Sequence, residues 1–244
     1  MKNNIIKSLL AVSSAILIVG CGSSGSENDS STSTSDLPSQ VQDAIDAPRS
    51  ILSQELTNTL SYMGNEERLA YDVYNELYRQ YGTKQFTNIA TKSEYKHITA
   101  VQQLVQKYKM NDDINFTNVD LPALGYMNTP IEDMQAGTYD IAKIQKLYDD
   151  LIAIGSTSEI DALKVGCMVE VVDITDLDAY IILAEQSNAS DVIDVFNFLR
   201  DGSYTHYWSF DEGLKSKGVD NGCCTLGAVY CHPEYPQNDK GKKE

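Results

Sequence analysis

Two pairs of chemically active side chains recur at a spacing of three residues. Glu94 and His97 form one pair, and Glu170 and Asp173 form the other. Residues three apart on an α-helix lie on the same face, so each pair presents two ligand groups in one direction. Carboxylates and imidazoles are ligands for first-row transition metal ions. The spacing therefore indicates metal binding, provided that these faces point into the protein.

Neighbouring apolar residues predict that these faces do point inward. Each pair shares its face with apolar residues spaced by three and four, namely Ile98, Val101 and Leu104 for the first pair and Gly166, Val169 and Leu177 for the second. Glu67 shares a face with Ala70 and Tyr74, and His206 shares one with Leu199. A charge buried alone is costly, so each group needs a partner. Four carboxylates and two histidines can thus meet in one bundle, as in di-iron and di-manganese bundle proteins.

Each residue also has a simpler explanation. Glu66 and Glu67 can be first-turn acids that the helix dipole favours. His206 can be a core histidine hydrogen-bonded to a backbone carbonyl, and Asp173 can cap a helix or pair at the surface. These separate explanations compete with a single one, in which the four carboxylates and two histidines together bind metal.

Four amphipathic stretches must hold these side chains. Apolar positions at spacings of three and four predict helices at four ranges, residues 66–81, 87–108, 158–184 and 190–210. Residues 109–157 form a long link with a short helix at 141–154, and an amphipathic segment at 41–63 is expected to pack outside. The pattern predicts an all-α protein. Its expected fold is a ferritin-like four-helix bundle with a long crossover link between helices two and three.

Several segments resemble known ferritin-like proteins, in order along the chain. The stretch from Glu67 to Tyr74 resembles the first-helix motif of rubrerythrins and erythrins, Glu-x-x-Ala-x-x-x-Tyr. Residues 50–215 resemble one prokaryotic ferritin-like family, catalogued as a domain of unknown function and related to erythrin, through SEYKH, GSTSEIDALKVGCMVEVVDITDL and FLRDGSYTH. The resemblance implies a cofactor of two iron ions, or manganese. It also implies the metal ligands Glu67, Glu94, His97, Glu170, Asp173 and His206.

The sequence departs from rubrerythrin on the third and fourth predicted helices. The third carries Glu-x-x-Asp, and Asp173 is one carbon shorter than the expected Glu. The fourth carries only His206, because Asn197 lies nine residues before it and therefore on the opposite face. The carboxylate count is complete only if Asp173 reaches the site.

The N-terminus has the pattern of a lipoprotein signal. Lys2 and Lys7 precede an apolar run from Leu9 to Val19, which is too short for a stable membrane span. The run ends in LIVGC, which resembles the bacterial lipobox and implies a signal peptide at 1–20 and an acylated Cys21. The Ser-rich residues that follow, up to residue 40, predict a flexible tether. The alternative is a conventional signal peptide.

This lipoprotein signal predicts a protein anchored in the cell envelope. The membrane is then a partner through the lipid only. Gly22 stands where retention signals for the inner membrane have Asp, so an outer membrane is favoured if the cell has one. The formal net charge of −16 repels phosphates and argues against nucleic acid as a partner, whereas it attracts metal ions.

Four cysteines besides Cys21 are expected to form disulfides in an oxidising envelope. They are Cys167, Cys223, Cys224 and Cys231. A bridge from Cys223 or Cys224 to Cys231 would close a small loop, and the remaining cysteine can pair with Cys167. A zinc site formed by the tail cysteines and His232 is an alternative. Residues 216–244 are therefore predicted to be a tail beyond the bundle.

The expected function is that of a di-metal protein, an oxidase or peroxidase acting on Fe(II), dioxygen or peroxide. The first alternative is a tethered helical module that binds or supports another molecule without catalysis. A second alternative is a copper or zinc carrier that uses the Cys-rich tail. The sequence has no nucleotide-binding glycine loop and no Ser/His/Asp order, so it gives no support to a kinase or hydrolase.

Overall fold

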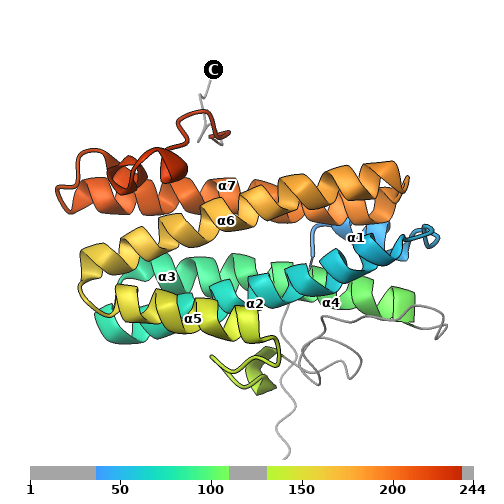
Figure 1. The fold of residues 1–244 in the computed structure, drawn as a ribbon, viewed down its shortest axis with the longest axis horizontal. Helices are drawn as coiled ribbons and strands as arrows, with labels where there is room; N and C mark the ends of the chain where they lie inside the picture. Colours follow the sequence, from blue (N-terminus) through green and yellow to red (C-terminus); the bar gives the residue numbers. More distant parts are fainter. Residues whose placement is uncertain (1–36, 110–130, 238–244) are drawn as a thin grey trace, which may run out of the picture. The chain divides into compact units, whose positions relative to one another are not determined.

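The computed structural model describes residues 37–109 and 131–237, and the regular structure in these ranges is entirely helical (Figure 1). Its long helices are α2 (Gln54–Tyr81), α4 (Tyr95–Lys109), α6 (Glu159–Gln186) and α7 (Ser190–Ser216). The shorter ones are α1 (Ser39–Asp46), α3 (Lys84–Ile89) and α5 (Ala142–Gly155), with a π-helical turn at Ala90–Glu94. The described residues contain no strand, which confirms the prediction of an all-α protein.

The long helices bury their apolar faces in two clusters with a polar layer between them. α2 packs against α4 and α6, α6 packs along α7, and α4 contacts α7. One cluster includes Val73, Phe86 and Phe210, and the other includes Leu60, Leu104 and Phe196. The predicted metal ligands lie between the two clusters.

The first long helix is longer than the sequence pattern predicted. Residues 54–63 continue into 66–81 as the single helix α2, so their assignment to a separate outer segment was wrong. The hydroxyl of Ser53 accepts a hydrogen bond from the backbone N–H of Leu56 and caps the helix start. Leu56, Leu60 and Met63 are fully buried, so this extension belongs to the core. Only α1 forms a separate piece, packed on α7 and α4, and it begins inside the predicted tether.

The second long helix contains a π-helical turn. α3, the turn at Ala90–Glu94 and α4 follow one another without a break. The buried residues Phe86, Ala90, Glu94 and Ile98 are each four apart. Four residues turn an α-helix by about 400°, so three such steps would move the buried face by about 120°. The wider π turn, with its i→i+5 hydrogen bonds, absorbs that drift and keeps all four residues inside.

The described part of the link between α4 and α6, residues 131–158, packs against α2 beside the site. α5 lies within a residue of its predicted position and packs on α2 and α6. The Arg68 Nη2 atom donates hydrogen bonds to the carbonyl oxygens of Gln135 (2.6 Å) and Thr138 (2.7 Å). Arg68 is buried next to Glu67, so these bonds fasten the link near the predicted ligands.

One disulfide fastens the C-terminal segment to α6, and a second closes a loop within that segment. Cys167 on α6 bonds Cys223, and Cys224 bonds Cys231 across a short loop. The predicted pattern of one small loop and one bridge to Cys167 is confirmed. With these sulfur atoms in disulfides, the tail offers no thiolate for the alternative zinc site. The segment follows α7 and holds the 3₁₀ turns Gly222–Leu226 and Ala228–Tyr230.

Within the described ranges, no helix is long and apolar enough to span a membrane. The predicted signal peptide, the acylated Cys21 and all but the last residues of the tether lie outside the part of the chain that the structure describes.

Candidate metal centre

Four helical segments bury all six of the predicted ligands in one layer, where five of them form two groups within ligand distance and Asp173 belongs to neither group. Glu67 comes from α2, and Glu94 and His97 come from the end of the π turn and the first turn of α4. Glu170 and Asp173 come from α6, and His206 comes from α7. Their exposed fractions lie between 1% and 8%, with Asp173 the most exposed. Six ionisable groups therefore share an interior with little access to water.

Glu94 lies at the centre of this layer. Its Oε2 atom is 3.0 Å from Nδ1 of His97, and its Oε1 atom is 3.0 Å from Nδ1 of His206. Each imidazole also faces a second carboxylate, because Nδ1 of His97 is 2.9 Å from Oε2 of Glu67 and Nδ1 of His206 is 3.3 Å from Oε2 of Glu170. The layer therefore contains two clusters of two carboxylates and one imidazole, and Glu94 belongs to both.

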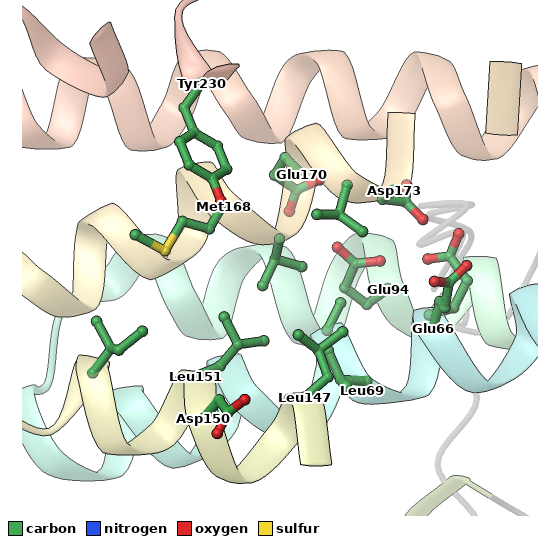
Figure 2. A pocket seen from close by; sticks show the side chains of 15 residues that line it. Glu66, Leu69, Glu94, Leu147, Asp150, Leu151, Met168, Glu170, Asp173 and Tyr230 are labelled. Carbon is green, nitrogen blue, oxygen red and sulfur yellow. The ribbon is translucent and has the colours of Figure 1, made fainter. Parts of the chain in front are cut away.

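Hydroxyl groups orient the carboxylates of α6. The Tyr74 hydroxyl donates a short hydrogen bond to Oε1 of Glu170, which leaves Oε2 of that residue directed at His206. The Ser203 hydroxyl donates to Oδ2 of Asp173 at 2.5 Å. Glu94 and Glu170 point toward one another across the interior, as Figure 2 shows. In the same view, Asp173 on α6 and Glu66 on α2 both lie at the end of the cavity away from Met168.

Burial makes most of these carboxyl groups hold their protons. Desolvation, followed by the negative charge of Asp173, raises the pKa of Glu67 well above its usual value. Desolvation and the charge of Glu170 likewise raise the pKa of Asp173. Desolvation also raises the pKa of Glu170, to about 7. The layer thus contains more carboxyl groups than its two histidines could neutralise if all of them were ionised.

The central carboxylate and the two histidines behave differently. Burial opposes the charge of Glu94, but the nearby His206 and His97 together hold its pKa below the usual value. Burial also opposes the charge of His206, but the carboxylates of Glu170 and Glu94 raise its pKa to about 10. Desolvation lowers the pKa of His97. Without metal, Glu94 and His206 therefore form a buried ion pair.

The structure bears on all three of the simpler explanations from the sequence. Glu66 and Glu67 do not lie in a first turn, because α2 begins at Gln54. The Nδ1 atom of His206 faces the carboxylates of Glu94 and Glu170. Asp173 is buried and faces inward, where it accepts a hydrogen bond from Ser203.

Three residues of the site were missed in the sequence pattern. Glu66 is buried beside the layer, where desolvation and then the charge of Asp176 raise its pKa. Ser203 supports Asp173, and its spacing of three from His206 was a usable signal. Gly202 faces His97 so closely that a Cβ atom there would lie 2.4 Å from Nε2 of the imidazole. No pattern of spacing could reveal Gly202, since the approach joins two different helices.

The donor atoms fit a pair of cations. Oxygen and imidazole nitrogen ligands suit iron, manganese and zinc. The Oε1 atom of Glu67 is buried without a hydrogen-bond partner within the described structure, so it has a free lone pair for a metal. Two positive ions would also neutralise carboxylates that otherwise repel one another.

Comparisons with known proteins identify relatives of this chain. Residues 57–228 match the family model described as "Uncharacterized protein domain (DUF2202)". A similar protein is uncharacterized protein MJ0754 of Methanocaldococcus jannaschii, 33% identical over 171 residues, which are 70% of this chain and 81% of that protein. The crystal structure of hypothetical protein MJ0754 aligns with a TM-score of 0.59 and 31% identity, covering 70% of this chain and 86% of that one.

Proposed function

Because the chain belongs to the DUF2202 family, we propose a function from the site that lies within the matched residues. The protein binds two metal ions, iron or manganese, in the centre of a ferritin-like four-helix bundle. α2, α3 with α4, α6 and α7 are the four helices of this proposed bundle. The connections from α2 to α3 and from α6 to α7 are short, and residues 110–158 make the long crossover.

The observation that supports this proposal best is the position of Glu94. One carboxylate oxygen faces His97 and the other faces His206, at 3.0 Å each. Such a carboxylate can bridge two cations, each of which also has its own imidazole and its own second carboxylate. Glu67 with His97 would hold one ion, and Glu170 with His206 would hold the other. Asp173, whose charge raises the pKa of Glu67 and whose own pKa is raised by Glu170, would complete the set.

The remaining residues of the site keep this arrangement in place. The hydroxyl of Tyr74 orients Glu170, and the hydroxyl of Ser203 orients Asp173. Such supporting hydrogen bonds fix the direction of a ligand and strengthen metal binding. An iron pair held in this way supplies electrons for the reduction of dioxygen or peroxide as Fe(II) becomes Fe(III). The proposed activity is therefore that of an oxidase or peroxidase, with Fe(II) as one candidate substrate.

Metal analysis of the purified chain tests the proposal. After anaerobic loading with Fe(II) and removal of free metal, we expect about two irons per chain, as in other carboxylate-bridged bundles. Glu94→Gln should lose both ions because it removes the shared ligand, whereas Glu170→Gln should lose chiefly one. Glu185→Gln changes an exposed carboxylate on the same helix and should retain both. A folded wild-type chain without metal, or full occupancy in Glu94→Gln, would favour the non-catalytic helical module.

We also propose that the protein is carried on a lipid anchor at Cys21. The support is the order of charged start, apolar run, small residue and cysteine at residues 1–21. Cell fractionation should find the full chain with the membranes, and Cys21→Ala should move it to the soluble fraction. Equal membrane association of both proteins would contradict the anchor.

A further inference from the structure

A cavity of about 190 Å³ lies beside the carboxylate layer, lined by residues of α2, α5 and α6. One part of its wall consists of Glu67, Glu94, Glu170 and Asp173. The rest is mainly aliphatic, and Leu69, Leu147, Leu151 and Met168 contribute to it. Figure 2 shows Glu94, Glu170 and Asp173 on one side of the cavity, and Leu147, Leu151 and Met168 on the other, with Asp150 on the aliphatic side.

The cavity opens to solvent between apolar residues and one carboxylate. Ile154 on α5 is 41% exposed and Val172 on α6 is 39% exposed, and both line the cavity. Asp150 also lines it, and its exposed side chain pairs with Lys146. Tyr230, from the segment after α7, reaches into the same wall beside Met168 (Figure 2). A small molecule can therefore pass from the surface toward the carboxylates along a largely apolar path.

The side chains that line the cavity determine which class of molecule it can bind. An aliphatic wall favours an apolar molecule, because burying apolar surface is stabilising and leaving polar groups unpaired is costly. All ionisable side chains in the lining other than Tyr230 are acidic, so an anionic ligand would meet repulsion and no compensating cation. An apolar cavity of roughly 150 Å³ holds benzene. This cavity is somewhat larger, so it fits a molecule of roughly six to ten non-hydrogen atoms.

We infer that this cavity binds a small, neutral, largely apolar organic molecule, with one end of the molecule against the carboxylate layer. As a statement about substrate, the inference rests on the proposed metal pair, which would lie at that end. Binding itself requires only the cavity. The two proposals can therefore fail separately.

Toluene is a suitable probe, and calorimetry or ligand-observed NMR on the full chain, with and without metal, measures its binding. We expect saturable binding in both forms. Val172→Trp and Leu147→Trp place a large side chain at the opening and in the wall, and each should weaken binding by about tenfold or more, since the lost contact area is that of several methylene groups. Ile182→Trp is the matched control, because Ile182 is an exposed aliphatic residue of α6 outside the cavity.

Benzoate, which has a similar ring and a negative charge, tests the selectivity for neutral molecules. In the metal-free chain, where no cation offsets the carboxylates, we expect no competition between benzoate and toluene. The inference is overturned if toluene does not bind the wild-type chain, if both Trp variants bind it as well as the control does, or if benzoate competes equally. Toluene binding to a chain that takes up no metal would support the cavity and overturn the proposed function alone.

Discussion

Glu94 owes its charge to the two histidines that flank it. Both imidazoles approach it at 3.0 Å, whereas the other carboxylates of the layer have at most one imidazole each. The neighbouring positive charge favours the ionised carboxylate despite complete burial, so the pKa of Glu94 is lowered while that of Glu67 is raised. A carboxylate that is already ionised is ready to bind cations without first releasing a proton.

Gly202 is required for the position of His97. The Cβ atom of an alanine would lie 2.4 Å from Nε2 and 2.6 Å from Cε1 of the imidazole, so the ring would have to move. We predict that Gly202→Ala weakens metal binding by about tenfold to about a hundredfold, the usual effect of losing support for a ligand. A chelator competition with Mn(II) measures the change.

Gly213→Ala is the control for this variant. It lies on the same helix, but its nearest neighbour would be a Leu163 methyl group at 3.2 Å. Circular dichroism should show equal helix content in both variants. Unchanged affinity in Gly202→Ala would mean that His97 does not bind metal in the observed orientation.

The metal-free protein should lose stability as the pH rises from about 6.5 to about 9. Burial raises the pKa of Glu67 and Asp173, so the folded state holds protons that the unfolded chain has released. The carboxylates of Glu170 and Glu94 raise the pKa of His206 to about 10, so its stabilising charge is present below about 6.5 and is lost toward 10. In this pH range, the titration of the carboxyl groups and that of His206 both lower the stability as the pH rises.

Thermal unfolding of the metal-free chain at several pH values measures this dependence. Bound metal should reverse it, because metal competes with protons for the same ligands and binds better at higher pH. His206→Gln removes one of the titrating groups and should flatten the metal-free curve. A midpoint that rises with pH in the metal-free protein would contradict the prediction.

At the scale of the helices, one buried carboxylate joins three segments at the end away from the tail. Asp191, at the start of α7, accepts hydrogen bonds from the Ser50 hydroxyl, the Tyr108 hydroxyl and the Lys107 ammonium group, each at 2.6 Å. Burial opposes its charge, but these donors keep the pKa of Asp191 below its usual value. The segment before α2, the end of α4 and the start of α7 are thereby held together.

Asp191→Ala should lower the free energy of unfolding by about 3 kcal/mol, because it leaves a half-buried ammonium group and two hydroxyls without their acceptor. Asp194→Ala, an exposed change one turn later, should cost less than about 0.5 kcal/mol. Chemical denaturation of both variants measures the difference. Similar losses in the two variants would show that Asp191 does not hold these segments together.

At the scale of the whole molecule, one disulfide joins the segment after α7 to α6, a helix that holds part of the site. Cys167 is on α6 beside Gly166, two residues before Val169 of the cavity wall. The Cys224–Cys231 bridge encloses Tyr230, which lies just beyond the family match at residues 57–228. This chain therefore completes the proposed cavity with a residue from outside the matched domain.

Removing the two disulfides should have unequal effects. The cysteines of the first bridge are 56 residues apart and those of the second are 7 apart. Loop-closure entropy then gives about 4 kcal/mol for the first and about 2 kcal/mol for the second. Denaturation of Cys167→Ala with Cys223→Ala, compared with Cys224→Ala with Cys231→Ala, tests this order. A larger loss from the short loop would show that native-state contacts, rather than chain entropy, dominate.

The sequence alone was sufficient for the helical class, for most helix faces and for the residues of the buried layer. Apolar spacing is local information, and it identifies the inward face of a helix without reference to the rest of the chain. For this reason, Glu94, His97, Glu170 and His206 could be placed on inward faces from the sequence alone. The cysteine pattern favoured two pairings, because the adjacent Cys223 and Cys224 rarely bridge each other without strain, but the spacing did not decide between the two.

Only the tertiary structure decided how these faces meet. The start of α2, the π turn before Glu94 and the approach of Gly202 to His97 depend on packing between helices that are distant in the sequence. The cavity exists because α5 and Tyr230 lie beside α2 and α6, which no periodicity within one segment can specify. The spacing of apolar residues shows which face of one helix points inward. The distances between side chains on different helices depend on how the whole core packs.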